Sequence, residues 1–253
     1  MGAPDLVVPP ALFDLQMRWL SRKGYTSLWM DELLAVRKKR ACGRYIAIQF
    51  DDGYLDVLEN AEPVLKQYGL KGTLFVSPGL LRNGPVHPHL PERKDLDASR
   101  FLSPEELLVL SQRKCIEIQA HGWTHRELVL LSGLELEAEL VGTRQWLGRL
   151  LNNPVDFLCF PRDSRNSEVI EATLSSGFKG YTGGKRTNTL GENTAEVSRI
   201  YATSCGFLWV DMLTFKHDIW LFSGVYACWP LRFLLKKFAE RCWADSTYKR
   251  VTP

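Results

Sequence analysis

The feature that most constrains the fold of this chain is a regular alternation of short apolar runs with segments of helical periodicity. The apolar runs, which predict buried strands, lie at 44–50, 71–77, 115–120, 155–160 and 178–183. The helical segments lie between them, at 60–69, 103–112, 132–152 and 166–177. Strand–helix units of this size predict an α/β fold with a parallel sheet and right-handed crossovers. Four or five such units favour a (β/α) barrel, complete or distorted, over an open sheet.

Residues typical of helix ends support these four helices. Side chains that can accept hydrogen bonds from the first turn of a helix precede or begin each segment. The predicted caps are Asn60, Asn166 and the capping boxes Ser103–Glu106 and Ser132–Glu135. Gly69 and Gly177 stand where two of the helices should end. The polar stretch 82–100 has no apolar periodicity and predicts a functional loop or lid, with His87 and His89 as surface residues.

Composition indicates an ordinary globular protein. With 253 residues, 45% of them hydrophobic, the chain can bury a full core, and we expect one domain over 1–253. The net charge of +3, from 32 basic and 29 acidic residues, gives no reason to expect a nucleic-acid partner. Six cysteines are scattered without a CxxC pair, so most are expected to be reduced core residues. The N-terminus does not resemble a secretory signal, and we expect a cytoplasmic location.

Two adjacent carboxylates, Asp51 and Asp52, follow the apolar run 44–50 directly, and Gly53 permits a sharp turn after them. In parallel α/β folds the carboxyl ends of the strands line the active face. Successive residues of an extended strand point to opposite sides, so the two carboxylates should have different tasks. One can reach a metal ion while its neighbour faces a water molecule.

Two histidines, His121 and His125, follow the apolar run 115–120. Imidazoles four residues apart can converge on one metal ion. Aspartate with two histidines leaves coordination positions open for water and substrate, as in catalytic rather than structural sites. Each pair alone is equally compatible with a solvated strand end or a surface turn. Together, directly after two strands of an alternating chain, they predict a metal site.

These motifs resemble those of the polysaccharide deacetylases, the NodB-homology group of carbohydrate esterase family 4. "QFDDGY" (49–54) resembles the first motif of that family and "HGWTH" (121–125) the second. The flanking text "ENAEPVLKQYGLKGTLFVSPGLL" is also similar to family sequences, and the resemblance covers residues 11–183. It implies a distorted or incomplete (β/α) barrel of the NodB type. It also implies hydrolysis of the N-acetyl group of an amino sugar, in a glycan or a lipid-linked sugar precursor.

The resemblance implies a role for individual residues. Asp51 corresponds to the general base, and Asp52, His121 and His125 correspond to the ligands of one divalent metal ion, usually zinc. The third motif resembles "CFPRDSRN" (159–166), in which the backbone N–H of Arg162 would help to stabilise the oxyanion. His217 resembles loosely the late histidine that protonates the leaving amine, but it lies early in the chain for that role. Its alternative interpretation is a structural pair with the neighbouring Asp218.

This sequence departs from the family at one position of the third motif. Many members place an arginine two residues before the proline of that motif, where it orients the base. Here that position is Cys159. Arg162 could take over the task, or its side chain could be a solvent-facing charge at a strand end; the sequence leaves both open.

The segment 219–235, within a longer apolar stretch 219–243, is strongly apolar and aromatic. Pro230 and Arg232 interrupt it, which argues against a membrane-spanning helix. It is interpreted either as the last elements of the barrel or as an amphipathic segment that rests on a membrane surface, which would suit a lipid-linked substrate. The sequence gives no indication of the oligomeric state.

Two alternatives to the metal-dependent deacetylase remain. A carbohydrate-binding protein could keep the fold without the chemistry, as the altered third motif suggests. A related hydrolase could cleave cyclic amides without a metal. The complete set of base and metal-ligand candidates argues against both, and the metal content of the purified protein would test the deacetylase mechanism first.

Overall fold

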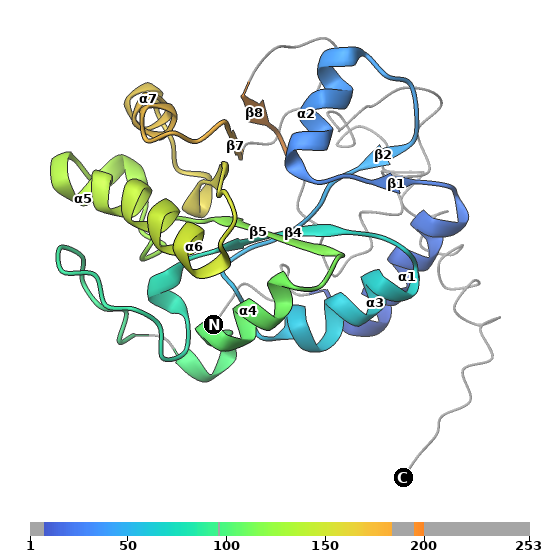
Figure 1. Ribbon diagram of the computed structural model, residues 1–253, viewed down its shortest axis with the longest axis horizontal. Helices are drawn as coiled ribbons and strands as arrows, with labels where there is room; N and C mark the ends of the chain where they lie inside the picture. Colours follow the sequence, from blue (N-terminus) through green and yellow to red (C-terminus); the bar gives the residue numbers. More distant parts are fainter. Residues whose placement is uncertain (1–7, 96, 184–194, 200–253) are drawn as a thin grey trace, which may run out of the picture.

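A computed structural model of the protein describes residues 8–95, 97–183 and 195–199 (Figure 1). Its centre is a parallel sheet of six strands in the order β3-β4-β5-β6-β7-β8, beside a parallel pair, β1 and β2. The strands are β1 (Thr26–Ser27), β2 (Tyr45–Ile46), β3 (Ile48–Phe50), β4 (Gly72–Val76), β5 (Ile116–Ala120), β6 (Phe157–Cys159), β7 (Gly180–Thr182) and β8 (Glu196–Val197). The sheet curls with helices packed around it, so the fold is the distorted (β/α) barrel that the alternation predicts.

Helices connect the strands and cover the sheet. The α-helices are α1 (Pro10–Arg22), α2 (Met30–Lys39), α3 (Glu62–Gln67), α4 (Pro104–Ser111), α5 (Gly133–Glu137), α6 (Thr143–Leu151) and α7 (Ser167–Ser175). Two π-helical turns, η2 (Val57–Ala61) and η6 (Ala138–Gly142), continue into α3 and α6. Single 3₁₀ turns are η3 (Pro78–Leu80), η4 (Ala98–Arg100), η5 (Leu128–Leu130) and η7 (Pro161–Asp163). In Figure 1, α1, α3 and α4 lie on one side of β4 and β5, and α2 lies on the other.

Alternation along the strands divides the buried side chains between two faces. Leu74 and Val76 of β4 belong to the main core, which the helices α1, α3, α4 and α6 cover. Phe75, between them, belongs to a second cluster with Met30 and Leu33 of α2. The inner face therefore holds the odd-numbered positions of β4, and α2 fills this side of the barrel.

The inner face is also polar. Glu117 of β5 accepts hydrogen bonds from the Thr73 hydroxyl at 2.5 Å and from the backbone N–H of Met30 at 2.9 Å. Burial raises the pKa of Glu117. The Gln119 side-chain oxygen, two residues further on, accepts from the N–H groups of Asp156 and Phe157. These bonds join α2, β4, β5 and β6 inside the barrel.

The five predicted strands are confirmed, with one refinement. The run 44–50 forms two strands, because β2 pairs with β1 while β3 pairs with β4. The strands β1 and β8 were not predicted, since two residues are too few to show a periodicity.

The helix caps are confirmed in part. The Ser103–Glu106 box and the Asn166 cap are present. The Asn60 cap is wrong, because the π-helical turn begins three residues earlier, at Val57. The box at Ser132 is also wrong: its side chain makes no capping bond, and Glu135 pairs with Arg126.

Several expectations fall on residues that the structure does not describe. His217 and the apolar stretch 219–243 lie outside the described residues, as do three of the six cysteines. Cys42, Cys115 and Cys159 are free. Within the described ranges, every helix is too short or too polar to pass through a bilayer.

We expect Leu74→Ala to destabilise the protein by about 2–5 kcal/mol, because the fully buried side chain would leave a cavity in the main core. Leu134→Ala, at a side chain that is 71% exposed, is the matched control and should change stability by less than about 0.5 kcal/mol. Urea unfolding curves of the two variants give the comparison. Equal losses would contradict the assignment of the core.

Candidate active site

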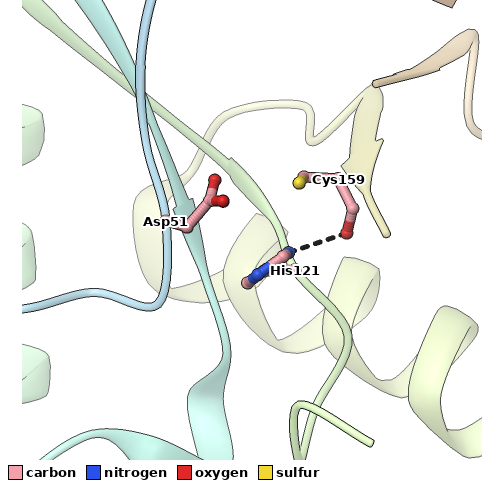
Figure 2. Close-up of side chains that lie close together, drawn as sticks. All are labelled: Asp51, His121 and Cys159. Carbon is pink, nitrogen blue, oxygen red and sulfur yellow. Dashed lines mark hydrogen bonds between the residues drawn. The ribbon is translucent and has the colours of Figure 1, made fainter. Parts of the chain in front are cut away.

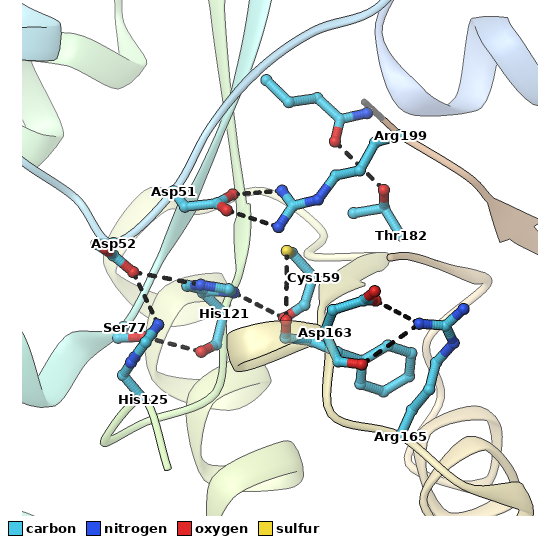
Figure 3. A network of polar contacts seen from close by, with 12 residues as sticks. Asp51, Asp52, Ser77, His121, His125, Cys159, Asp163, Arg165, Thr182 and Arg199 are labelled. Atoms are coloured by element: carbon cyan, nitrogen blue, oxygen red, sulfur yellow. Dashed lines mark hydrogen bonds and ion pairs between the residues drawn. The ribbon is translucent and has the colours of Figure 1, made fainter. Parts of the chain in front are cut away.

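The carboxyl ends of four strands bring the candidate residues together. Asp51 and Asp52 follow β3 directly, His121 follows β5, and Cys159 is the last residue of β6. Arg199, two residues after β8, also reaches this place (Figure 3). Because the strands are parallel, residues far apart in the sequence meet at one end of the barrel.

Asp52, His121 and His125 form one group whose ligand atoms all lie within 4.8 Å of one another. The Oδ1 atom of Asp52 lies 3.3 Å from Nε2 of His121 and 3.2 Å from Nε2 of His125. The sequence-predicted metal ligands are therefore neighbours in space. Whether they hold a metal remains a prediction.

The backbone and side chain of His121 are fixed by its neighbours. Its N–H donates to the carbonyl of Val76 at 2.9 Å, and its carbonyl accepts from the Ser77 hydroxyl at 2.8 Å. Its Nδ1 lies 2.8 Å from the carbonyl oxygen of Cys159. A carbonyl only accepts, so Nδ1 carries the hydrogen, and in the neutral ring Nε2 presents its lone pair towards Asp52.

Asp52 Oδ1 provides a test of whether a cation fits here. This atom is buried and, within the described residues, accepts no hydrogen bond. Leaving a carboxylate oxygen buried without a donor costs free energy, which a cation at this point would recover. Its neighbours are two imidazole nitrogens, which with a carboxylate make a typical set for zinc and similar divalent ions. The residues therefore fit a divalent metal ion.

The surroundings shift the pKa values of His121 and His125 in opposite directions. Burial lowers the pKa of His121, but neighbouring acidic groups, Cys159 and then Asp51, raise it well above its usual range. Burial and the nearby His121 lower the pKa of His125 to about 4. Metal binding would require both rings to be neutral.

Asp51 is held by Arg199 rather than by the histidines. Nη1 and Nη2 of Arg199 lie 2.8 and 2.7 Å from the two carboxylate oxygens, a bidentate ion pair (Figure 3). Burial raises the pKa of Asp51, but the Arg199 guanidinium outweighs it and holds that pKa at about 2. The two adjacent carboxylates thus have different partners, as the alternation along an extended strand predicted.

A second group, Asp51 with His121 and Cys159, also has ligand atoms within 4.8 Å of one another (Figure 2). Both oxygens of Asp51 are already engaged by a guanidinium, which would repel a metal ion placed beside them. Burial also raises the pKa of the Cys159 thiol, so a thiolate ligand is disfavoured. Of the two groups, the one around Asp52 therefore fits a divalent metal ion better.

The side chain of Arg162 does not replace the missing arginine of the third motif. Its guanidinium is exposed and lies 3.3 Å from Glu127. The arginine that pairs with Asp51 is Arg199. The role assigned to Arg162 by resemblance concerns its backbone N–H, directly after Pro161 at the end of β6, and this stays a prediction.

Sequence analysis missed Arg199. The signal was the period of two: Val197 of β8 belongs to the inner cluster, so Arg199, two residues later, should point to the same side. Because β8 was not recognised, this placement could not be made. The histidines of the loop 82–100 are not ligands. His87 is half-buried with its ring centre 4.7 Å from that of Trp123, and His89 is exposed.

Backbone strain concentrates around the site. Non-glycine residues with positive φ include Asp52 (72°), His125 (60°), Arg162 (54°) and Asp163 (59°). Such conformations are costly for residues with a Cβ and persist where the surroundings enforce them, often at functional sites. Asp163 is tied to Arg165, which also reaches Glu196 of β8 at 3.2 Å.

Comparison with known proteins gives consistent results. A sequence model of the polysaccharide deacetylases matches residues 38–181, more than half of the chain. YxkH of Bacillus subtilis, named as a polysaccharide deacetylase, is 27% identical over 69% of this chain. The chain spans only 58% of that relative's length. The poly-β-1,6-N-acetyl-D-glucosamine N-deacetylase of Staphylococcus aureus is 23% identical over 79% of this chain and 69% of its own.

A solved structure shares the fold. The deacetylase PplD of Streptococcus pyogenes, solved in complex with acetate, superimposes with a TM-score of 0.72 at 19% identity. The match covers 85% of this chain and 90% of that one. The distorted barrel is thus a known architecture.

The ion pair between Asp51 and Arg199 predicts how acid stability changes. The folded-state pKa of Asp51, about 2, lies below its ordinary value of 3.8. The pair therefore stabilises the folded state above about pH 4, and this contribution is lost as the pH falls towards 2. Arg199→Met leaves a desolvated carboxylate without its cation, so the metal-free variant should be less stable at pH 6, with the difference narrowing between pH 4 and 2.

Denaturant unfolding of the metal-free proteins across this pH range measures the difference. Arg162→Met, which removes an exposed guanidinium paired with Glu127, is the control and should give a small, nearly constant difference. The same flat profile in Arg199→Met would contradict the assigned partner of Asp51.

Proposed function

The chain belongs to the polysaccharide deacetylase family, and we propose that it is a metal-dependent hydrolase that removes the N-acetyl group from an amino sugar in a glycan or a lipid-linked precursor. Its named relatives are deacetylases, which hydrolyse carbon–nitrogen bonds other than peptide bonds. One observation carries the proposal for this chain. A buried carboxylate oxygen of Asp52 faces two imidazole nitrogens, and the second carboxylate, Asp51, lies directly beside this group.

In this proposal Asp52, His121 and His125 hold one divalent ion, with Zn²⁺ as the candidate. When bound, such an ion would polarise the acetyl carbonyl as a Lewis acid and lower the pKa of water at the site. The bond from His121 Nδ1 to the Cys159 carbonyl orients the ring for this task.

Asp51 is the proposed general base. Its pKa of about 2 keeps the carboxylate ionised at neutral pH, so it is always able to accept a proton. The same low pKa makes it a weak base, which removes a proton efficiently only from an acidified water molecule. The ion pair with Arg199 thus favours a mechanism in which base and metal act together.

The remaining steps involve the backbone of Arg162 and the side chain of His217. Attack of the water oxygen on the acetyl carbon places negative charge on the carbonyl oxygen, which the backbone N–H of Arg162 would stabilise. Cleavage of the carbon–nitrogen bond then requires a proton on the leaving amine, and His217 is the candidate donor. The products are acetate and a free amino sugar.

We propose polymeric N-acetylglucosamine as the first substrate class to test, because the S. aureus relative is named for that activity. A cytoplasmic location, association with a membrane surface and a single domain over 1–253 stay predictions from the sequence. A metal-independent hydrolase of cyclic amides fits poorly with the Asp52, His121 and His125 group. A non-catalytic carbohydrate-binding protein would not need Asp51 held ionised by a bidentate arginine.

We expect the purified protein to contain about one divalent ion per chain, and His125→Ala to lose it, because one of three ligands is removed. Elemental mass spectrometry measures the content. His89→Ala, at an exposed histidine, is the control and should retain the ion. A wild-type protein that stays free of metal after reconstitution would exclude the mechanism.

We expect Asp51→Asn to retain the metal but to lower kcat for acetate release by about 10²–10⁴-fold, because the amide cannot accept the proton. Acetate released from N-acetylglucosamine oligomers is measured together with metal content. Asp56→Asn, at an exposed aspartate five residues on, should leave both values unchanged. A full rate in Asp51→Asn would mean that another group is the base.

A further inference from the structure

The turn between the two candidate histidine ligands is held by two charged side chains from other parts of the chain. Thr124 is buried and lies directly before His125. Its N–H donates to Oε2 of Glu139 at 3.0 Å, and its hydroxyl donates to Oε1 of the same carboxylate. Its carbonyl accepts from Nη1 of Arg93 at 2.7 Å. Every polar group of Thr124 is therefore engaged.

Glu139 is buried completely, in the π-helical turn η6. Besides Thr124, the N–H of Trp123 donates to its Oε2 at 2.5 Å. Burying a carboxylate is expensive, and an apolar side chain of similar size would fill the same space at lower cost. The three hydrogen bonds offset this cost, and all of them come from residues between His121 and His125. Isolated π-helical turns frequently occur at functional sites.

The packing leaves this carboxylate little freedom. A Cβ added to Gly122 would lie 3.1 Å from Oε2 of Glu139 and 3.4 Å from Pro161. Gly122 itself has a φ of 69°, which favours glycine. The turn 121–125 therefore packs closely against Glu139 and against Pro161 of the third motif.

Arg93 connects the turn to the loop 82–100. Its Nε and Nη2 donate to the two carboxylate oxygens of Asp95, both at 2.8 Å, while Nη1 donates to the carbonyl of Thr124. The negative charges of Asp95, Glu139 and Asp52 all raise the pKa of Arg93, the effect of Asp95 being the largest. Arg93 thus interacts electrostatically with Asp52 of the candidate metal site.

These contacts act on a strained residue. His125 has a φ of 60°, a conformation that a residue with a Cβ keeps only when its surroundings enforce it. Thr124, the preceding residue, is fixed at its N–H and hydroxyl by Glu139 and at its carbonyl by Arg93. These bonds restrict the backbone next to His125.

We propose that Glu139 and Arg93 are positioning residues that hold the turn 121–125 in its metal-binding conformation and so set the affinity for the divalent ion. The inference rests on the proposed metal site. Glu139 acts by accepting hydrogen bonds, and Arg93 acts by donating one, so substitutions that keep these bonds should preserve the affinity.

The test is a competition titration of the full-length, metal-stripped protein with Zn²⁺ and a chromophoric chelator. We expect Glu139→Ala to weaken Zn²⁺ binding by about 10–100-fold, as is typical for groups that orient metal ligands. Glu139→Gln should stay within a few-fold of the wild type. Its oxygen can accept from both backbone N–H groups, and its NH₂ can donate to the Thr124 hydroxyl. Glu137→Ala, at an exposed position of α5, is the matched control and should bind like the wild type.

Arg93→Met provides a second variant in case Glu139→Ala does not fold, because Arg93 lies on a surface loop. We expect several-fold weaker Zn²⁺ binding, with the melting temperature in chelator unchanged. The stabilisation that added Zn²⁺ gives should be smaller than in the wild type. Lys94→Met, at the exposed neighbouring position, is its control.

The outcomes separate this inference from the proposed function. Wild-type Zn²⁺ affinity in folded Glu139→Ala, or in Arg93→Met if Glu139→Ala does not fold, would overturn the positioning role and leave the metal site intact. A wild-type protein that binds no divalent ion would overturn the proposed function, and this inference with it. Weak binding in Glu139→Gln equal to that in Glu139→Ala would overturn the role of the hydrogen bonds and point to the charge instead.

Discussion

The ion pair between Asp51 and Arg199 connects the ends of β3 and β8, two strands that do not pair with each other in the described sheet. Asp51 follows β3 and Arg199 follows β8, the two edges of the six-stranded sheet, and 148 residues separate them in sequence. A barrel must bring its first and last strands together. Within the described residues side chains do this: the ion pair is supported by a bond from Arg37 of α2 to the carbonyl of Glu196 and by one from the Thr182 hydroxyl to Gln49. The contact that connects the two edges of the described sheet is therefore also the contact that holds Asp51 in the site.

The same pair determines how Asp51 can react. A guanidinium at hydrogen-bond distance keeps the carboxylate ionised but weakens it as a base. In many family members the corresponding arginine would stand at the position of Cys159, on β6. Here the cation is Arg199, which follows β8, and the position on β6 holds the buried thiol of Cys159. A change of residue type in one motif is thus compensated by a residue outside all the motifs.

The parts of the fold that could be predicted from the sequence are those that depend on residues close together in the chain. Apolar runs gave five strands, and the capping box at Ser103 gave the start of α4, because both depend on neighbouring residues. The proximity of Asp52, His121 and His125 could be predicted because parallel strands end on one face. Arg199 and Glu139 could not be predicted in this way. Their partners are distant in sequence, β8 is too short to show its period, and Glu139 lies in a π-helical turn whose register departs from 3.6 residues. The box predicted at Ser132 was wrong for a related reason, since Glu135 has an alternative partner in Arg126.

The distribution of charge decides which of the two aspartates should take the ion. Asp51 has its positive charge permanently in place, because arginine does not lose its proton in proteins. Among the described residues, Asp52 lies against two histidines, which must be neutral to act as ligands. Once they are neutral, no ion pair like that of Asp51 with Arg199 balances the negative charge of Asp52 in the described part of the chain. Asp52 and His125 both keep a positive φ in this arrangement. A divalent ion at this point would remove the imbalance, so the arrangement of fixed charges favours metal at Asp52 and an ionised carboxylate, paired with Arg199, at Asp51.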